Sequence, residues 1–122
     1  SRDAVRRYFT DALPGVKGVA LRDAIAKEEG QPLVAYLLGR RLHGDGAHGD
    51  ALVWLDAVLA AGDAVPPSIR REALRLAIES AYGADKCLRV RELAREATTY
   101  GTAFARRAGD WVARCEHDET AK

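Results

Sequence analysis

Apolar residues recur along the chain at intervals of three and four, the spacing of one face of an α-helix. Alternating β-branched runs are absent, and good helix formers dominate: Ala, Leu, Arg and Glu. Glycines and prolines interrupt the pattern at regular intervals and mark turns. The pattern predicts seven helices, over residues 3–12, 16–29, 31–43, 48–61, 66–82, 84–98 and 100–116. We therefore expect an all-α fold whose helices are joined by short turns.

The length and composition are typical of one globular domain. The chain has 122 residues, of which 48% are hydrophobic and 30% charged. This is enough to bury a core, so we expect a single domain over residues 1–122 with a polar, frayed tail at 117–122. Because the sequence starts at Ser1 and contains no methionine, we expect it to be part of a larger protein.

The cysteines and the hydropathy pattern predict a compartment. Cys87 and Cys115 lie far apart and form no CxxC motif, and a secreted disulfide scaffold of this size would carry more cysteines. We interpret them as two buried free thiols in a reducing, cytoplasmic compartment. No apolar run approaches the ~18 residues of a membrane span, so we expect no membrane partner. Fifteen of the nineteen basic residues are arginine, which is typical of a GC-rich, bacterial-type genome.

The third and fourth predicted helices carry a pattern of small and large residues. The sequence has Leu38-Gly39, then Gly46 in the turn, then Ala51, Leu55 and Val58. Over about residues 33–62 this pattern resembles the tetratricopeptide repeat, in which small residues let two antiparallel helices approach closely. The chain departs from the repeat at Ala35, Leu42 and Asp63, where an aromatic residue, a tyrosine and a proline are usual. The next helix pair has a comparable shape, but its offset is about 38 residues instead of 34.

The resemblance implies an architecture and a class of function. Helix–turn–helix pairs would stack into a superhelix, closed by a C-terminal capping helix. Such a domain would be an interaction or scaffold module that binds a partner protein, peptide or helix in a concave groove. The inner helices would line the groove, with the partner-binding positions at Tyr36, Arg40, His43, Arg70, Leu74 and Ile78.

Four arginine pairs recur on alternate predicted helices: Arg6-Arg7, Arg40-Arg41, Arg70-Arg71 and Arg106-Arg107. In a groove, repeated guanidiniums could bind acidic side chains or a carboxylate through paired hydrogen bonds. Alternatively, each arginine forms a local surface ion pair with an acid such as Glu72, Glu79 or Asp110.

The stretch His43-Gly-Asp-Gly-Ala-His48-Gly-Asp50 has the composition of a ligand site but not the spacing. It contains no HExxH motif, no calcium-loop pattern and no lysine for a phosphate loop. We interpret it as a turn, in which glycines supply positive φ and Asp50 or His48 caps the next helix. The cluster from Cys115 to Asp118 shows no metal spacing or nucleophile signature either. We expect no metal, no cofactor and no enzymatic activity.

The alternative class of function is nucleic-acid binding by a helix-turn-helix. Residues 84–98 place Lys86, Arg89, Arg91 and Arg95 on one segment after the Gly83 turn, as a recognition helix would. The same segment carries Asp85, Glu92 and Glu96, and the net charge of the chain is only +1. DNA-binding domains usually have a marked basic excess, so we expect a protein partner.

Overall fold

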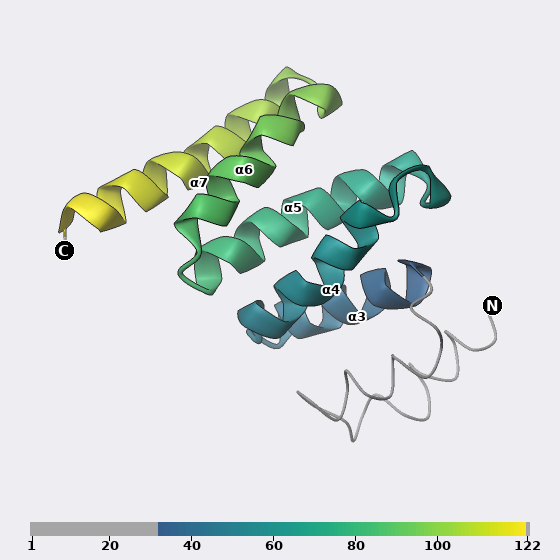
Figure 1. Cartoon of the computed structure of the whole chain (residues 1–122). Coiled ribbons are helices and arrows are strands. Elements are labelled where there is room, and N and C mark those ends of the chain that lie inside the picture. The colour runs from purple at the N-terminus through teal and green to yellow at the C-terminus, as the bar shows by residue number, and fades with distance from the viewer. Residues whose placement is uncertain (1–31, 122) are drawn as a thin grey trace.

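The computed structural model describes residues 32–121, and within this range it contains α-helices, two short 3₁₀ turns and no strand (Figure 1). The helices are α3 (Pro32–Gly44), α4 (His48–Ala60), α5 (Pro67–Gly83), α6 (Cys87–Glu96) and α7 (Thr102–Ala121). The 3₁₀ turns are η3 (Gly62–Ala64) and η4 (Ala97–Tyr100). The all-α prediction is confirmed for these residues.

Five α-helices are described where the sequence predicted seven. The helices predicted at 3–12 and 16–29 lie outside the described residues. The other five have close counterparts in α3 to α7. The C-terminal residues differ from the prediction, because α7 continues to Ala121 where a frayed tail was expected from residue 117. Tyr82 donates a hydrogen bond to Asp118, and Arg91 forms an ion pair with Glu119, so this last turn is attached to its neighbours.

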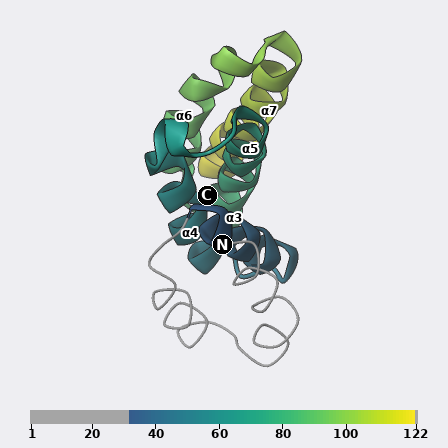
Figure 2. The ribbon, with the colours of Figure 1, turned by 90° about the vertical axis from the view of Figure 1, so that its right-hand side faces the viewer.

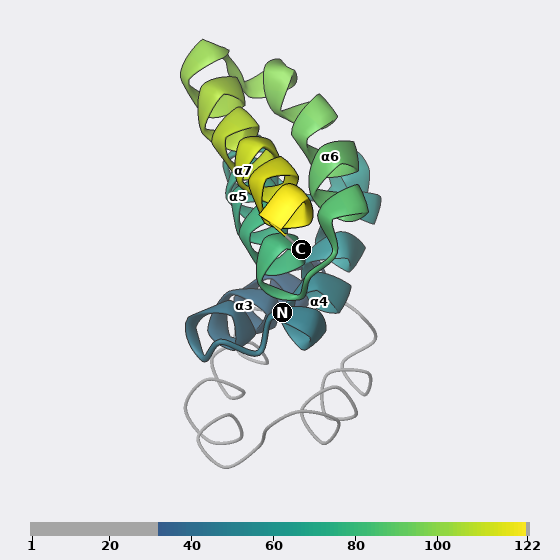
Figure 3. The same ribbon diagram turned by 90° about the vertical axis from the view of Figure 1, so that its left-hand side faces the viewer.

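Each helix packs against the next along the chain, and α5 also packs against α3 and α7. Two views at right angles to Figure 1 show the result: α4 and α6 lie along one side of the described region, and α3, α5 and α7 along the other (Figures 2 and 3). α5 therefore contacts all four of the other helices.

The core runs between these two sets of helices. Its largest fully buried side chains include Leu38, Leu55, Leu74, Ile78 and Leu93. The predicted close approach of α3 and α4 is confirmed at Gly39, where an added Cβ would lie 2.7 Å from Leu55 Cγ. A side chain at Gly39 would therefore displace a residue that is itself fully buried.

The turns confirm some of the sequence predictions and correct others. Gly46 has φ +78° in the α3–α4 turn, as expected for a glycine that supplies positive φ. The predicted side-chain cap of α4 is wrong: its cap position is Ala47, which makes no side-chain hydrogen bond, and His48 and Asp50 lie in the first turn of the helix. Gly83 is needed for packing, because an added Cβ would lie 2.4 Å from the His48 ring.

The free-thiol prediction is wrong. Cys87 at the start of α6 and Cys115 in α7 form a disulfide, with their Cα atoms 5.7 Å apart. They are 28 residues apart in sequence, but α6 and α7 are antiparallel neighbours, which brings the two positions together. The prediction of a reducing compartment rested on free thiols and loses that support.

The longest described helix, α7, is rich in charged residues. Among residues 32–121 no helix combines the length and the apolar character that crossing a membrane requires.

Candidate functional site

One stripe of α3 faces α5. Tyr36, Arg40 and His43 are spaced four and three residues apart, so their side chains share one side of the helix. His43 Nε2 donates a hydrogen bond to Glu79 Oε1 on α5 at 2.9 Å. Burial raises the pKa of the Tyr36 phenol, and the Glu72 carboxylate adds to that rise, while the Arg40 guanidinium opposes it. These contacts place the α3 stripe beside the acidic residues of α5.

The facing stripe of α5 is charged along its length. Arg75 donates hydrogen bonds to Glu72 three residues before it and to Glu79 four residues after it, the latter at 2.8 Å. Hydrogen bonding from Arg75 lowers the pKa of the Glu72 carboxyl, although partial burial opposes the shift. The same bonds raise the pKa of Arg75. Arg75 is thus the shared ion-pair partner of both glutamates on this face.

A hollow of about 530 Å³ lies between α5 and α7. Its floor includes Phe104 of α7, whose ring is 5.5 Å from the Arg71 guanidinium carbon, within range of a cation–π contact. Tyr100 packs beside Phe104 with ring centroids 5.5 Å apart. The hollow is lined by Ser68, Arg71, Glu72, Arg75, Glu79, Phe104 and Arg107.

We call the surface formed by the α3 stripe and this hollow the α3–α5–α7 face. Four guanidiniums, those of Arg40, Arg71, Arg75 and Arg107, stand here against the carboxylates of Glu72 and Glu79, so the face has a net positive charge. Among the described residues, no acidic side chain forms an ion pair with Arg40, Arg71 or Arg107. Three exposed cations are therefore available to an external acidic group.

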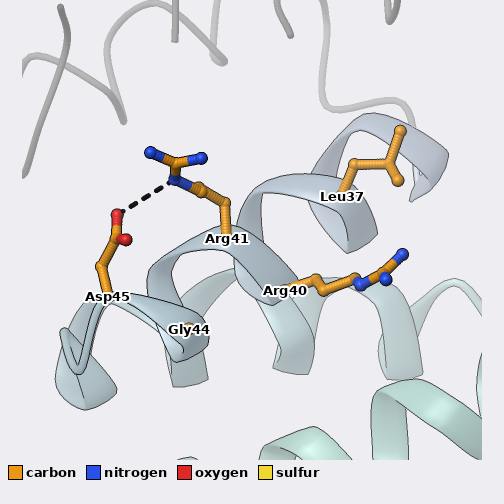
Figure 4. A pocket seen from close by; sticks show the side chains of 5 residues that line it. All are labelled: Leu37, Arg40, Arg41, Gly44 and Asp45. Atoms are coloured by element: carbon orange, nitrogen blue, oxygen red, sulfur yellow. Dashed lines mark hydrogen bonds and ion pairs between the residues drawn. The ribbon is translucent and has the colours of Figure 1, made fainter. Parts of the chain in front are cut away.

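The described arginine pairs each divide between two surfaces. Arg40 belongs to the α3–α5–α7 face, whereas Arg41 donates to Asp45 at 3.2 Å. Figure 4 shows the Arg40 side chain pointing away from the Arg41–Asp45 ion pair, although Arg40, Arg41 and Asp45 all line a smaller hollow of about 330 Å³ beside Leu37. Arg70 pairs with Asp63 at 3.3 Å, and its neighbour Arg71 lines the larger hollow. Of the last pair, Arg107 lines that hollow and Arg106 does not.

The structure separates the six predicted groove residues into two groups. Tyr36, Arg40 and His43 lie together on the α3–α5–α7 face. Leu74 and Ile78 do not, because they are 0% and 2% exposed in the core. Arg70 is turned toward Asp63 and also lies outside the hollow. Leu74 and Ile78 are therefore too buried to contact a partner, and the α5 residues that line the hollow are one position further along: Arg71, Glu72, Arg75 and Glu79, with Ser68.

A signal for this charged stripe of α5 is present in the sequence. Arg71, Arg75 and Glu79 follow one another at intervals of four, and the apolar residues of this helix fall between them. Phe104 and Arg107, three residues apart on α7, are harder to find. As an aromatic residue, Phe104 is expected in the core, and it is only 5% exposed. Its cation–π contact with Arg71 joins residues 33 positions apart, which no local pattern indicates.

The helix of the alternative nucleic-acid class is α6, and two of its cations are engaged. Arg89 donates to Asp56 on α4 at 2.9 Å and to Glu92 at 3.0 Å, and the bond to Asp56 raises the pKa of Arg89. Arg91 pairs with Glu119 on α7. These ion pairs hold α6 against its neighbours and neutralise charge that a phosphate backbone would need.

The two histidines of the α3–α4 turn lie close together without forming a ligand cluster. The His43 and His48 rings are 5.7 Å apart in an edge-on arrangement, and His48 packs on Gly83. Across residues 32–121, no three His, Cys, Asp or Glu side chains gather in a way that could hold a metal ion. Asp45 accepts a hydrogen bond from Arg41, as a turn residue.

Comparisons with known proteins give no relative: no protein family matches the sequence, and neither the curated proteins nor the solved structures contain a match.

Proposed function

We propose that the chain is a helical-repeat interaction module that binds an acidic segment of a partner protein on the α3–α5–α7 face. One observation carries the proposal: the hollow between α5 and α7 presents Arg71 and Arg107, neither of which forms an ion pair within residues 32–121. Arginine binds carboxylates through two parallel hydrogen bonds. Phe104 beneath Arg71 supplies apolar contact area and limits the conformations of that guanidinium.

The arrangement of the helices supports the same proposal. Alternate helices α3, α5 and α7 lie on one side and α4 and α6 on the other, as in a stack of helix pairs (Figures 2 and 3). In the tetratricopeptide-like architecture that the sequence resembles, the first helix of each pair lines the concave groove. A partner peptide or helix in that groove would contact Tyr36 and Arg40 on α3 and the hollow between α5 and α7.

The ion pairs within the α3–α5–α7 face would shape the surface that the partner contacts. Arg75 holds Glu72 and Glu79 in place, and Glu79 in turn holds His43. These side chains are bonded to one another, so they provide shape and hydrogen-bonding positions and add no net positive charge. Net attraction for an acidic partner comes from Arg40, Arg71 and Arg107, which a partner can reach because all three are exposed.

A selection from a displayed library of random dodecapeptides, with the 122-residue chain as bait, tests the proposal. We expect enriched peptides that combine Asp or Glu with apolar residues, and we expect their binding to weaken with added salt. No enrichment, or enrichment of basic peptides, would contradict the proposal. Generic duplex DNA is the parallel probe, because tight DNA binding with a steep loss on added salt would favour the nucleic-acid class.

A further inference from the structure

The disulfide fixes the part of α7 that has the fewest buried contacts. Among residues 109–121 only Cys115 is buried, whereas Trp111, Val112 and Asp118 are half-buried and the other side chains are exposed. The first half of α7 is anchored differently, because Phe104 and Ala108 are 5% and 3% exposed in the core. The two halves of one helix thus depend on different interactions.

The non-covalent contacts of residues 109–121 are two polar bonds to neighbouring helices and the packing of half-buried Trp111 and Val112 against the core. Tyr82 donates to Asp118 at 2.5 Å and packs against Trp111 with ring centroids 5.1 Å apart. Arg91 pairs with Glu119, whose side chain is 49% exposed. The cation–π contact of Arg114 with Trp111 lies within α7 and does not attach the helix to anything. An exposed ion pair such as Arg91–Glu119 contributes little to stability.

The two cysteine residues differ in exposure. Cys115 is fully buried, and Cys87, in the first turn of α6, is partly exposed. An external thiolate would therefore reach the disulfide at Cys87 Sγ, and Cys115 would leave as the released thiol. Formation of the bond removes two protons and two electrons from the cysteine thiols. A low-molecular-weight disulfide, such as oxidised glutathione, takes them up and is released as two thiols.

We propose that Cys87–Cys115 is a redox-controlled clasp that holds residues 109–121 of α7 on α5 and α6, and that reduction releases this half-helix while the rest of the described fold stays in place. Release would uncover Tyr82 and expose the Trp111 and Val112 side chains. The clasp is independent of the proposed groove, whose α7 residues Phe104 and Arg107 lie in the first half of the helix.

Hydrogen exchange measured by mass spectrometry on the 122-residue chain tests the clasp. Upon reduction by a phosphine, we expect the amides of residues 109–121 to exchange about tenfold faster or more, and those of α5 to change by less than about twofold. Reoxidation with oxidised glutathione should restore the slow exchange. The Cys87→Ala variant should exchange fast at residues 109–121 with or without the phosphine, which controls for effects of the reductant.

Three results would overturn the clasp. The first is unchanged exchange at residues 109–121 after complete reduction, confirmed by alkylation of both thiols. The second is an equal acceleration in α5 and α7, because the disulfide would then stabilise the whole chain instead of one half-helix. The third is a failure of reoxidation to restore the slow exchange.

Discussion

Neighbouring arginines on a helix point about 100° apart, because the α-helix has 3.6 residues per turn. In each described pair, this rotation places one guanidinium on the α3–α5–α7 face and its neighbour elsewhere. Arg41 and Arg70 pair with Asp45 and Asp63. Local ion pairing therefore holds for Arg41 and Arg70, whereas groove binding by their neighbours Arg40 and Arg71 stays a proposal.

Gly39 is a residue at which the fold depends on the absence of a side chain. We expect Gly39→Ala to lower the free energy of unfolding by about 1–3 kcal/mol, because its Cβ would overlap buried Leu55. Gly109→Ala is the matched control: it lies inside α7 with nothing within 4 Å, and it should be neutral or raise stability by up to about 1 kcal/mol. Urea denaturation measures both, and equal effects would contradict the packing at Gly39.

Glu72 gives the stability a pH dependence in the acid range. Hydrogen bonding from Arg75 lowers its pKa below the usual 4.5 in the folded chain, so the unfolded chain binds the proton more readily. The stability that the Glu72–Arg75 pair contributes is fully present above the pKa of Glu72 in the unfolded chain. It is lost as the pH falls through the lower pKa of Glu72 in the folded chain. Glu72→Gln should therefore cost less than about 1 kcal/mol at neutral pH, since the pair is part-exposed.

Urea denaturation of wild type and Glu72→Gln across the acid range measures this dependence. We expect the difference between them to shrink below pH 4.5. A difference that is the same in acid and at neutral pH would show that the carboxylate contributes no charge-dependent stability.

Among the helices, the sequence predicted the positions of α3 to α7, but the interpretation of α5 assigned two core residues to its exposed side. The 3.6-residue periodicity with glycine and proline breaks predicted five helices that correspond to α3 to α7. For α5, however, the groove stripe was assigned through Leu74 and Ile78, which are core residues. The partners of α5 lie on several sides, so its apolar surface is wide and leaves only a narrow charged stripe.

The disulfide could not be predicted because it depends on tertiary structure. Two cysteines 28 residues apart carry no local spacing signal. Their approach requires α6 to begin where the second half of α7 passes, which follows from the antiparallel packing of the two helices and from the length of η4 between them. The contact between Arg71 and Phe104 could not be predicted either, because it also depends on how two helices pack.

Because α5 is central, we expect the same substitution, leucine to alanine, to have different effects on stability at Leu74 of α5 and at Leu88 of α6. Leu74→Ala should lower the free energy of unfolding by about 2–5 kcal/mol, because Leu74 is fully buried in the core. Leu88→Ala, at a side chain that is 69% exposed on α6, should change it by less than about 0.5 kcal/mol. Thermal and urea unfolding measure both, and a small effect at Leu74 would contradict the assignment of α5 to the core.

At the scale of the whole molecule, charge is distributed between two sides with different roles. On α4 and α6, the Arg89–Asp56 ion pair joins neighbouring helices. On the α3–α5–α7 face, Arg75 pairs with both glutamates, and three other arginines have no acidic partner among residues 32–121. The net charge of the whole chain is only +1, so it does not indicate the local excess of positive charge on this face. Composition alone therefore could not indicate an acidic partner, although the arginine pairs pointed toward one.

The proposed function requires that a partner segment bind at the hollow between α5 and α7. Fluorescence anisotropy with one acidic peptide from the library selection tests this binding in wild type, Arg107→Glu and Arg106→Glu. The two variants carry the same charge change on adjacent exposed residues of α7, but only Arg107 lines the hollow. We predict that Arg107→Glu weakens binding about tenfold or more and that Arg106→Glu changes it by less than about threefold. Equal losses in the two variants would contradict the claim, because binding would then depend on the overall charge of α7 and not on this site.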